Sequence, residues 1–440
     1  MKLANRIILC AGCLVLLLLS WLIAINAKST VQIQLELMDK AAALTKDGIY
    51  TLAAPLLEEA AGYTTEITPM AESELKKVYL SLIGKKGYRY KYTDLLEKQM
   101  SRKDAKPEVF AEAARYYLGA SSIPEALDVL KAGIKKTGSD ELTALYELNR
   151  YCYETGRDIY ENAAEIFDST AQVCIDGLWG IAKADGTPMI PCMYERISTF
   201  SADRAIVQNE GEIFAIDKDS NRIAKLHENA TAFGNYSHDR IAILLHGGWR
   251  RSTGEFAIGS AIFEYIGTYS DGYAAAKFDG RWGVVDLALE WLVPAEYDAI
   301  IMDELGRSCS NSAVFARQNG AVTLLVNGEQ TGGAFEDAHP FMGGEYAAVK
   351  KNGKWGFIDM TGMLIIDYQF DDARSFGQHL AAIEQDGLWG YISIYGDIAI
   401  EPIFLEAKSF SNGSAPVLTH RGWQFITLLE YKTSGPGLFS

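Results

Sequence analysis

Two adjacent carboxylate pairs are the side chains of this 440-residue chain with the clearest potential for chemistry. Glu336-Asp337 and Asp371-Asp372 could supply the acid and the base that cleave a glycosidic bond. Both pairs fall in predicted turns between strands, and the chain carries 57 acidic against 41 basic residues. Solvated turn carboxylates are therefore the favoured interpretation, and we expect no enzyme activity.

A second acidic segment has ligand types at calcium-loop spacing. Asp217, Asp219, Asn221 and Glu228 occupy positions 1, 3, 5 and 12 of such a loop, but Arg222 stands where the loop requires glycine. We therefore expect a turn between strands, with no metal and no cofactor. The histidines show no i, i+4 pairing and are His227, His238, His246, His339, His379 and His420.

Aromatic side chains recur near the predicted strand ends. If exposed, they could stack on sugar rings or hold a peptide. Because every repeated unit has them, we favour their filling the core between units. They are Tyr194, Trp291, Tyr297, Tyr368, Tyr395 and Phe404.

These side chains are positioned by a repeat, whose clearest copy is Asn352–Asp359 (NGKWGFID). Aligned on the tryptophan, eight units of about 34 residues fill residues 172–429, and Ile213 and Val322 replace the tryptophan in two of them. We assign the signature residues a structural role. They are Trp179, Gly180, Trp249, Trp282, Gly283, Trp355, Gly356, Trp389, Gly390 and Trp423.

The sequence of each unit predicts β structure. Ala347–Lys350 is an extended run, Asn352-Gly353 suits a tight turn with positive φ, and Trp355–Asp359 is the returning strand. The alanines beside the strand and Gly356 indicate that the tryptophan ring lies over residues too small to obstruct it. One hairpin cannot bury such a ring alone, so neighbouring units must stack.

This pattern resembles the WG-repeat family of bacterial proteins. The resemblance implies an all-β repeat domain, often on secreted or membrane-anchored proteins, with no catalytic residues to transfer. Blades of a typical propeller are longer, at about 40–45 residues. We therefore expect an open, β-solenoid-like array, with a closed propeller as the alternative.

Residues 29–168 have helical apolar spacing and are expected to form antiparallel helical hairpins. Within Phe110–Lys136, Gly119 ends one helix, Ser122 can cap the next, and Gly133 permits a close helix crossing. This segment resembles a tetratricopeptide-type helix pair, which implies a protein-interaction scaffold. A plain helical bundle that spaces the next domain from a membrane is the alternative.

Residues 1–28 combine Lys2 and Arg6 with an apolar run at residues 7–25. Its 19 residues are close to the roughly 20 that a helix needs to cross a bilayer. We expect an uncleaved signal anchor with the N-terminus in the cytoplasm and the bulk of the chain outside. The alternative is a signal peptide cleaved after Ala27, giving a secreted protein. Residues 430–440 form a C-terminal tail.

Charge and cysteine content narrow the function classes. A net charge of -16 excludes the basic surface that nucleic-acid binding needs. The scattered cysteines do not form a disulfide framework, although one bridge between Cys152 and Cys174 remains open.

The sequence thus predicts an α plus all-β multidomain protein, membrane-anchored and extracytoplasmic, with a non-catalytic binding or scaffolding role at a bacterial cell surface. Its ligand would be a protein or a cell-wall glycan. A cell-wall glycan hydrolase using loop carboxylates and an extracellular ligand-sensing component are the alternatives. Function is expected where the units differ, in the long interval between Trp282 and Val322 and in the units around Ile213 and Trp249.

Overall fold

The computed structural model describes residues 29–431, which divide into a helical unit and a β unit near residue 146. Within this range no helix is long and apolar enough to span a bilayer. The membrane anchor expected at residues 7–25 and most of the expected C-terminal tail lie outside the described residues.

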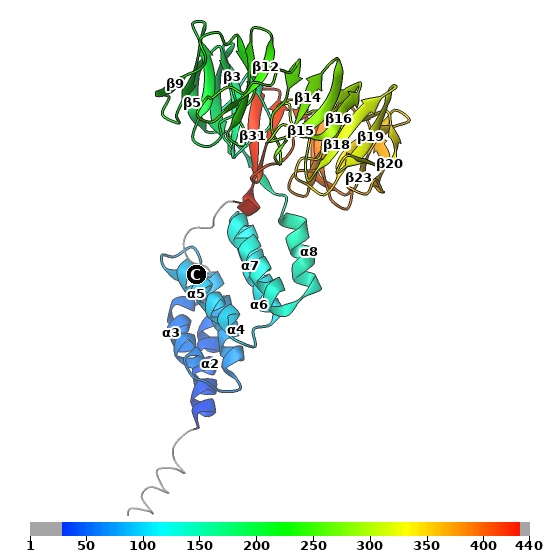
Figure 1. Cartoon of the computed structure of the whole chain (residues 1–440). Coiled ribbons are helices and arrows are strands. Elements are labelled where there is room, and N and C mark those ends of the chain that lie inside the picture. The colour runs from blue at the N-terminus through cyan, green and yellow to red at the C-terminus, as the bar shows by residue number, and fades with distance from the viewer. Residues whose placement is uncertain (1–28, 432–440) are drawn as a thin grey trace, which may run out of the picture. The chain divides into compact units, whose positions relative to one another are not determined.

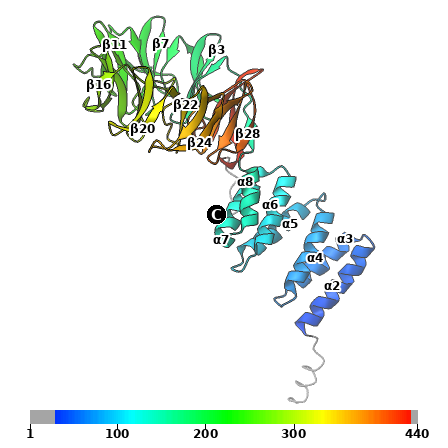
Figure 2. The same ribbon diagram turned by 90° about the vertical axis from the view of Figure 1, so that its right-hand side faces the viewer.

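The helical unit is a succession of short helices around one apolar core (Figure 2). Each of the first five helices packs against the next one in the chain. The helices are α2 (Thr30–Lys46), α3 (Tyr50–Ala61), α4 (Thr68–Ser81), α5 (Tyr88–Ser101), α6 (Pro107–Gly119), α7 (Ile123–Thr137) and α8 (Asp140–Asn149).

Gly133 of α7 explains how three helices approach closely. A Cβ at this position would lie 2.8 Å from the Phe110 Cβ of α6 and 2.7 Å from the Leu142 Cδ1 of α8. The predicted close crossing at Gly133 is thus present. Ser122 is the N-cap residue of α7, but its side chain makes no capping hydrogen bond. The resemblance to tetratricopeptide repeats stays a prediction.

The β unit is an eight-bladed propeller in which each blade is one antiparallel sheet (Figure 1). The expected open solenoid is therefore wrong, and the propeller alternative is the observed fold. Blades 1 to 4 are β2 (Asn162–Ala163), β3 (Thr170–Ile175), β4 (Leu178–Lys183), β5 (Pro188–Tyr194); β6 (Arg196–Ile197), β7 (Ala205–Asn209), β8 (Glu212–Ile216), β9 (Arg222–Lys225); β10 (Ala232–Phe233), β11 (Arg240–Leu245), β12 (Gly248–Thr253); and β13 (Tyr265–Ile266), β14 (Tyr273–Phe278), β15 (Arg281–Asp286), β16 (Trp291–Tyr297).

Blades 5 to 8 continue the same order. They are β17 (Ala299–Ile300), β18 (Ala313–Gln318), β19 (Ala321–Val326), β20 (Glu329–Phe335); β21 (Asp337–Ala338), β22 (Ala347–Lys351), β23 (Lys354–Ile358), β24 (Leu364–Phe370); β25 (Asp372–Ala373), β26 (Leu380–Gln385), β27 (Leu388–Ser393), β28 (Ile398–Phe404); and β29 (Glu406–Ala407), β30 (Ser414–Thr419), β31 (Gly422–Leu428) with β1 (Tyr153–Thr155). A 3₁₀ turn, Leu429–Tyr431, follows.

The ring closes through strands from opposite ends of the β unit. β1 pairs antiparallel with β31, with Tyr153 opposite Leu428 and Thr155 opposite Ile426, and completes blade 8. In Figure 1 the red β31 accordingly lies among the first, green strands. This pairing covers an edge that an open array would leave exposed. The helices end at Asn149, so residues 153–168, which we expected in the helical region, belong to the propeller.

The hairpins of six units are built as their sequences indicate. Asn352 and Gly353 have φ of 53° and 75°, the positive values of a type I′ turn. The same sign occurs at Asp176-Gly177, Glu210-Gly211, Asp279-Gly280, Asn319-Gly320 and Asp386-Gly387.

The glycine after the tryptophan has a different role from the one expected. A Cβ on Gly356 would lie 2.7 Å from the Ile366 carbonyl oxygen and 3.0 Å from the Tyr368 nitrogen. The register of β23 and β24 shifts at this point, so the outer strand bulges toward the glycine. Gly180, Gly283 and Gly390 meet the outer-strand backbone in the same way. Close approach of that backbone, and not clearance for the ring, requires glycine.

Candidate functional site

The long interval between Trp282 and Val322 contains a loop, residues 301–309, that lies on the propeller axis. From blade 5, Glu304 accepts hydrogen bonds from the Lys408 Nζ of blade 8 and the Glu165 backbone N–H of blade 1. The Leu305 carbonyl accepts one from the Asn235 Nδ2 of blade 3 at 3.0 Å. Because one loop reaches inner residues of three other blades, we call residues 301–309 the axial loop.

Buried charges hold the axial loop in place. Asp303 and Arg307 form an ion pair at 2.6 Å, and their side chains are only 10% and 13% exposed. Glu165 is buried beside them and accepts the Ser409 backbone N–H at 3.2 Å. Burial raises the pKa of Glu165 to about 7, although Arg374, Arg307 and Lys408 act in the opposite direction. These contacts are structural, since they join blades to one another.

The repeat tryptophans of blades 6 to 8 are covered by one repeated position, the residue after the inner two-residue strand. His339 stacks on Trp355 with a centroid distance of 4.9 Å. Arg374 lies 5.3 Å above Trp389, and Lys408 lies 5.2 Å above Trp423. These three tryptophans are only 5–7% exposed. Their rings are therefore occupied by intramolecular partners.

The tryptophans of blades 3 and 4 also have a ring partner. Tyr265 contacts Trp249 at 6.0 Å and Trp282 at 5.3 Å between centroids.

Blade 1 departs from this arrangement. Ala164 occupies the covering position, because its N–H donates to the Gln172 carbonyl as that of Arg374 donates to Ala382. Trp179 is only half-buried and lines a pocket of about 330 Å³. The other side chains of this Trp179 pocket include those of Asn162, Gln172, Arg196 and Glu304. These residues are not among the candidates expected from the sequence. The alanine at the covering position is only a weak signal, because Gly234 and Gly267 hold that position in blades 3 and 4.

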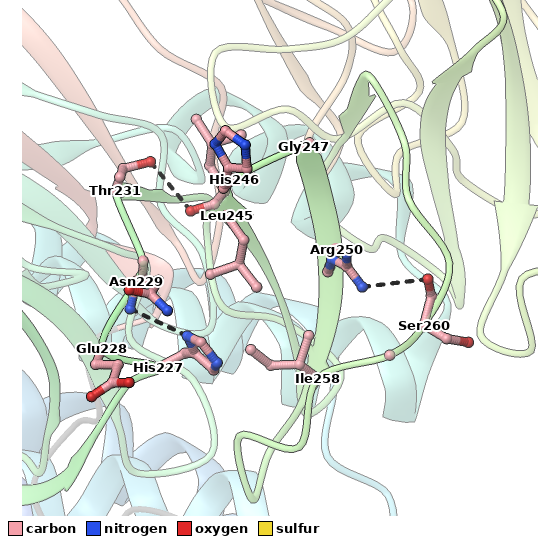
Figure 3. A pocket seen from close by; sticks show the side chains of 14 residues that line it. His227, Glu228, Asn229, Thr231, Leu245, His246, Gly247, Arg250, Ile258 and Ser260 are labelled. Carbon is pink, nitrogen blue, oxygen red and sulfur yellow. Dashed lines mark hydrogen bonds between the residues drawn. The ribbon is translucent and has the colours of Figure 1, made fainter.

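Blade 3 carries a second pocket, of about 1120 Å³ (Figure 3). The segment that returns beside β12 is irregular: the Gly259 N–H bonds the Arg251 carbonyl at 2.9 Å, and Phe263 pairs with Trp249. His227, His246 and Arg250 line the space beside this segment. We call it the blade 3 pocket, and it falls in the irregular part of the array around Ile213 and Trp249.

The side chains of the blade 3 pocket make few and long hydrogen bonds. Arg250 Nη1 reaches the Ser260 carbonyl at 3.5 Å, and His227 Nδ1 accepts the Asn229 N–H at 3.2 Å (Figure 3). His227 and His246 are exposed. The pocket therefore offers donors and acceptors to an outside ligand.

The predicted carboxylate pairs are engaged in turns. Glu336 accepts the backbone N–H groups of Asn352 and Gly353 at 2.8 and 3.0 Å, so it holds a hairpin turn. Asp371 accepts the Lys354 ammonium and the Asp386 N–H, and these bonds lower the pKa of Asp371. A lowered pKa keeps this carboxyl ionised, whereas a general acid must be protonated.

Asp337 and Asp372 complete the two pairs. Asp337 pairs with Arg317 at 2.7 Å, and Asp372 accepts the Ala373 N–H at 2.8 Å.

The calcium-like segment is a turn, as predicted. Asp217 Oδ1 accepts the N–H groups of Asp219 and Asn221, both at 2.9 Å. Asp359 makes the same pair of bonds in blade 6, to Thr361 and Met363. Residues 29–431 contain no group of three or more His, Cys, Asp and Glu side chains that could hold a metal ion.

Comparison with solved structures gives remote similarities only. Hsv2p of Kluyveromyces lactis has 8% identity and a TM-score of 0.33, over 50% of this chain and 88% of that one. The WD40 domain of Neurospora crassa Pan2 has 9% identity and a TM-score of 0.34, over 61% and 89%. The extracellular domain of the one-component system BT4673 from B. thetaiotaomicron has 10% and 0.32, over 65% and 51%. No curated protein matches the sequence.

The repeats themselves match a known family. The WG containing repeat matches residues 179–212, 253–282, 334–355, 355–389 and 389–423. These segments lie within the propeller and include every signature tryptophan and glycine named above except Trp249 and Gly283. The C-terminal domain of this chain thus contains WG containing repeats.

Proposed function

We propose that this protein is a non-catalytic binding or scaffolding component whose ligand binds on the propeller. One observation carries the proposal: two pockets of the propeller lie where the units depart from the repeat pattern, in blades 1 and 3. In the regular blades 6 to 8, the tryptophans are covered and the carboxylates examined hold turns. Binding surfaces on a repeat scaffold are made by such local deviations.

The proposal includes anchoring in a bacterial membrane with the propeller outside the cytoplasm. It is supported by Lys2 and Arg6 before the apolar residues 7–25. The ligand is a protein or a cell-wall glycan. A protease-shaving experiment on intact cells tests the location, because peptides containing Trp355 should be released; their protection would contradict the outside placement.

Binding is tested with the detergent-solubilised full chain, by pull-down from membranes and by co-sedimentation with purified cell wall. The double variant His246→Gln/Arg250→Gln should reduce retention of the partner at least fivefold. Arg421→Gln removes an exposed arginine on the blade 8 hairpin and is the matched control, expected to bind as wild type.

Two results would contradict the proposal. One is the absence of any saturable partner in both assays. The other is turnover of wall polymer by the wild-type protein that is lost in Asp371→Asn/Asp372→Asn, because this would make the loop carboxylates catalytic.

A further inference from the structure

We propose that the Trp179 pocket binds one sugar ring that carries a carboxylate. This inference rests on the binding function proposed above and names its ligand class. The sugar's apolar face would lie on the Trp179 ring, and its carboxylate would pair with Arg196.

The first argument is the exposed face of Trp179. Within the described part of the chain, the other five repeat tryptophans are each contacted by a ring or a cation, His339, Arg374, Lys408 or Tyr265. Trp179 has no such partner there, because Ala164 ends at its methyl group. An aromatic surface left half-buried in a pocket is a platform for a ring of similar size. The 330 Å³ of this pocket is within the range of about 300–1,000 Å³ typical of small-molecule sites.

The second argument is the charge of Arg196. In blade 7, the guanidinium over Trp389 also pairs with Glu406, the first residue of the next inner strand, at 2.9 Å. Arg196 is the first residue of β6 and holds the same position beside blade 1. At blade 1 the positive group, Arg196, is therefore on the inner strand of the next blade. The charged group that would lie over Trp179 is missing. A ligand carboxylate over Trp179 would pair with Arg196. This is the Arg374–Glu406 pair of blade 7 with the two charges exchanged.

Arg196 is available for this pair. It lies 5.1 Å from the Phe233 ring and donates one hydrogen bond, to the Phe233 carbonyl at 3.3 Å. No carboxylate of residues 29–431 lies within ion-pair distance of it. A guanidinium has five N–H donors in a planar fork that suits a carboxylate. In a chain with net charge -16, an unpaired arginine at a pocket is an anion-binding group.

The third argument concerns the remaining polar groups, which suit hydroxyls. Gln172 is fixed as a wall, since its Nε2 donates to the Ile197 carbonyl and to Asn235 Oδ1. The exposed amide of Asn162 makes no side-chain hydrogen bond to another described residue. Glu304 uses one lone pair of each oxygen and keeps others. A flat aromatic acid offers no donor to the remaining lone pairs of Glu304 and no partner to Asn162, whereas sugar hydroxyls can bond to both.

A cationic ligand is less suitable for the same pocket. Lys408 already neutralises Glu304, and Arg196 would repel a second cation.

The test titrates the solubilised full chain with glucuronate, glucose and benzoate, by calorimetry and saturation-transfer NMR. Glucuronate should bind at least tenfold more tightly than either of the others. Arg196→Gln should remove most of the preference over glucose. Ala164→His should weaken glucuronate at least tenfold, because a neutral imidazole would stack on Trp179 as His339 stacks on Trp355, without repelling Arg196. Arg421→Gln is again the control.

Equal affinity for glucose or benzoate would overturn the proposal, as would unchanged glucuronate binding in Ala164→His. If Ala164→His fails to fold, as seen by circular dichroism, the surface variant Arg196→Gln still decides. If the partner is still retained in the pull-down but glucuronate binding is unaltered in Arg196→Gln and Ala164→His, this site is refuted and the binding function is not. If no partner is found by pull-down or co-sedimentation but glucuronate binds as expected, only the cell-surface partner proposed above is refuted.

Discussion

Lys408 and Glu304 form an ion pair at the propeller axis, although they belong to blades 8 and 5 and lie 104 residues apart. The Lys408 side chain is 7% exposed and that of Glu304 is 33% exposed. The pair links the axial loop to the last blade, and it shows that this loop fastens the ring from inside.

Replacing Glu304 with glutamine should therefore destabilise the propeller. The change leaves the buried Lys408 ammonium with only its longer ion pair, to Glu406 at 3.4 Å, and we expect a loss of about 1–3 kcal/mol, reduced by the partial exposure of Glu304. The shift of the urea unfolding midpoint measures the effect. Lys354→Gln breaks the exposed pair with Asp371 and should shift the midpoint much less, because solvent and salt screen exposed ion pairs. An equal effect of both variants would contradict a special role for the axial pair.

Stability should depend on pH through Glu165. Its pKa is raised from 4.5 to about 7 by burial, so the folded state holds the proton more tightly than the unfolded state does. The stabilisation is complete below about pH 4.5 and is lost as pH rises through about 7, amounting to at most about 3 kcal/mol. The unfolding midpoint of the wild type should therefore fall as the pH rises from 5 to 8. The midpoint of Glu165→Gln should fall less steeply. Parallel curves would show that Glu165 does not titrate in this range.

The glycine after the repeat tryptophan should tolerate no side chain. Gly356→Ala places a Cβ 2.7 Å from the Ile366 carbonyl oxygen, and we expect a loss of about 2–4 kcal/mol. Gly353→Ala is the matched control, because it meets no atom within 4 Å and strains only a φ of +75°. It should cost about 1 kcal/mol. Thermal unfolding of both variants gives the comparison, and a smaller effect at Gly356 would contradict the close approach.

Cys152, Cys174, Cys192 and Cys309 should all be found as free thiols. Burial raises the pKa of the Cys309 thiol to about 12, so little thiolate exists at pH 8. We expect Cys309 to resist alkylation in the native protein and to react after denaturation, as mass spectrometry of labelled peptides would show. A peptide cross-linked through Cys152 and Cys174 without reduction would contradict the structure.

The local structure of the propeller could be predicted, because its signals are local. Asn352-Gly353 fixes a turn, and Trp355 lies at the start of the strand that returns from it, Lys354–Ile358. Closure could not be predicted, since β1 has three residues and pairs with a strand about 270 residues later in the chain. The inner strands of two residues are also too short to leave a pattern. They allow a closed blade within about 34 residues, which is why the length argument for a solenoid failed.

The candidate sites were harder to predict for a different reason. The extra residues before Val322 marked an insertion, but nothing local indicates that Glu304 would meet Lys408 and Glu165. At the Trp179 pocket the signal is a missing group, Ala164 where other blades have His339, Arg374 or Lys408. An alanine has no reactive group, so its residue type alone does not indicate a site.

The pairing of β1 with β31 also sets an order for biogenesis. β1 is made first and cannot find its partner until Gly422–Leu428 has emerged, so the ring stays open throughout synthesis. A polypeptide released before Gly422 would leave β1 and the edge of β30 unpaired, which favours aggregation and proteolysis. The ring can therefore close only in chains that contain β31.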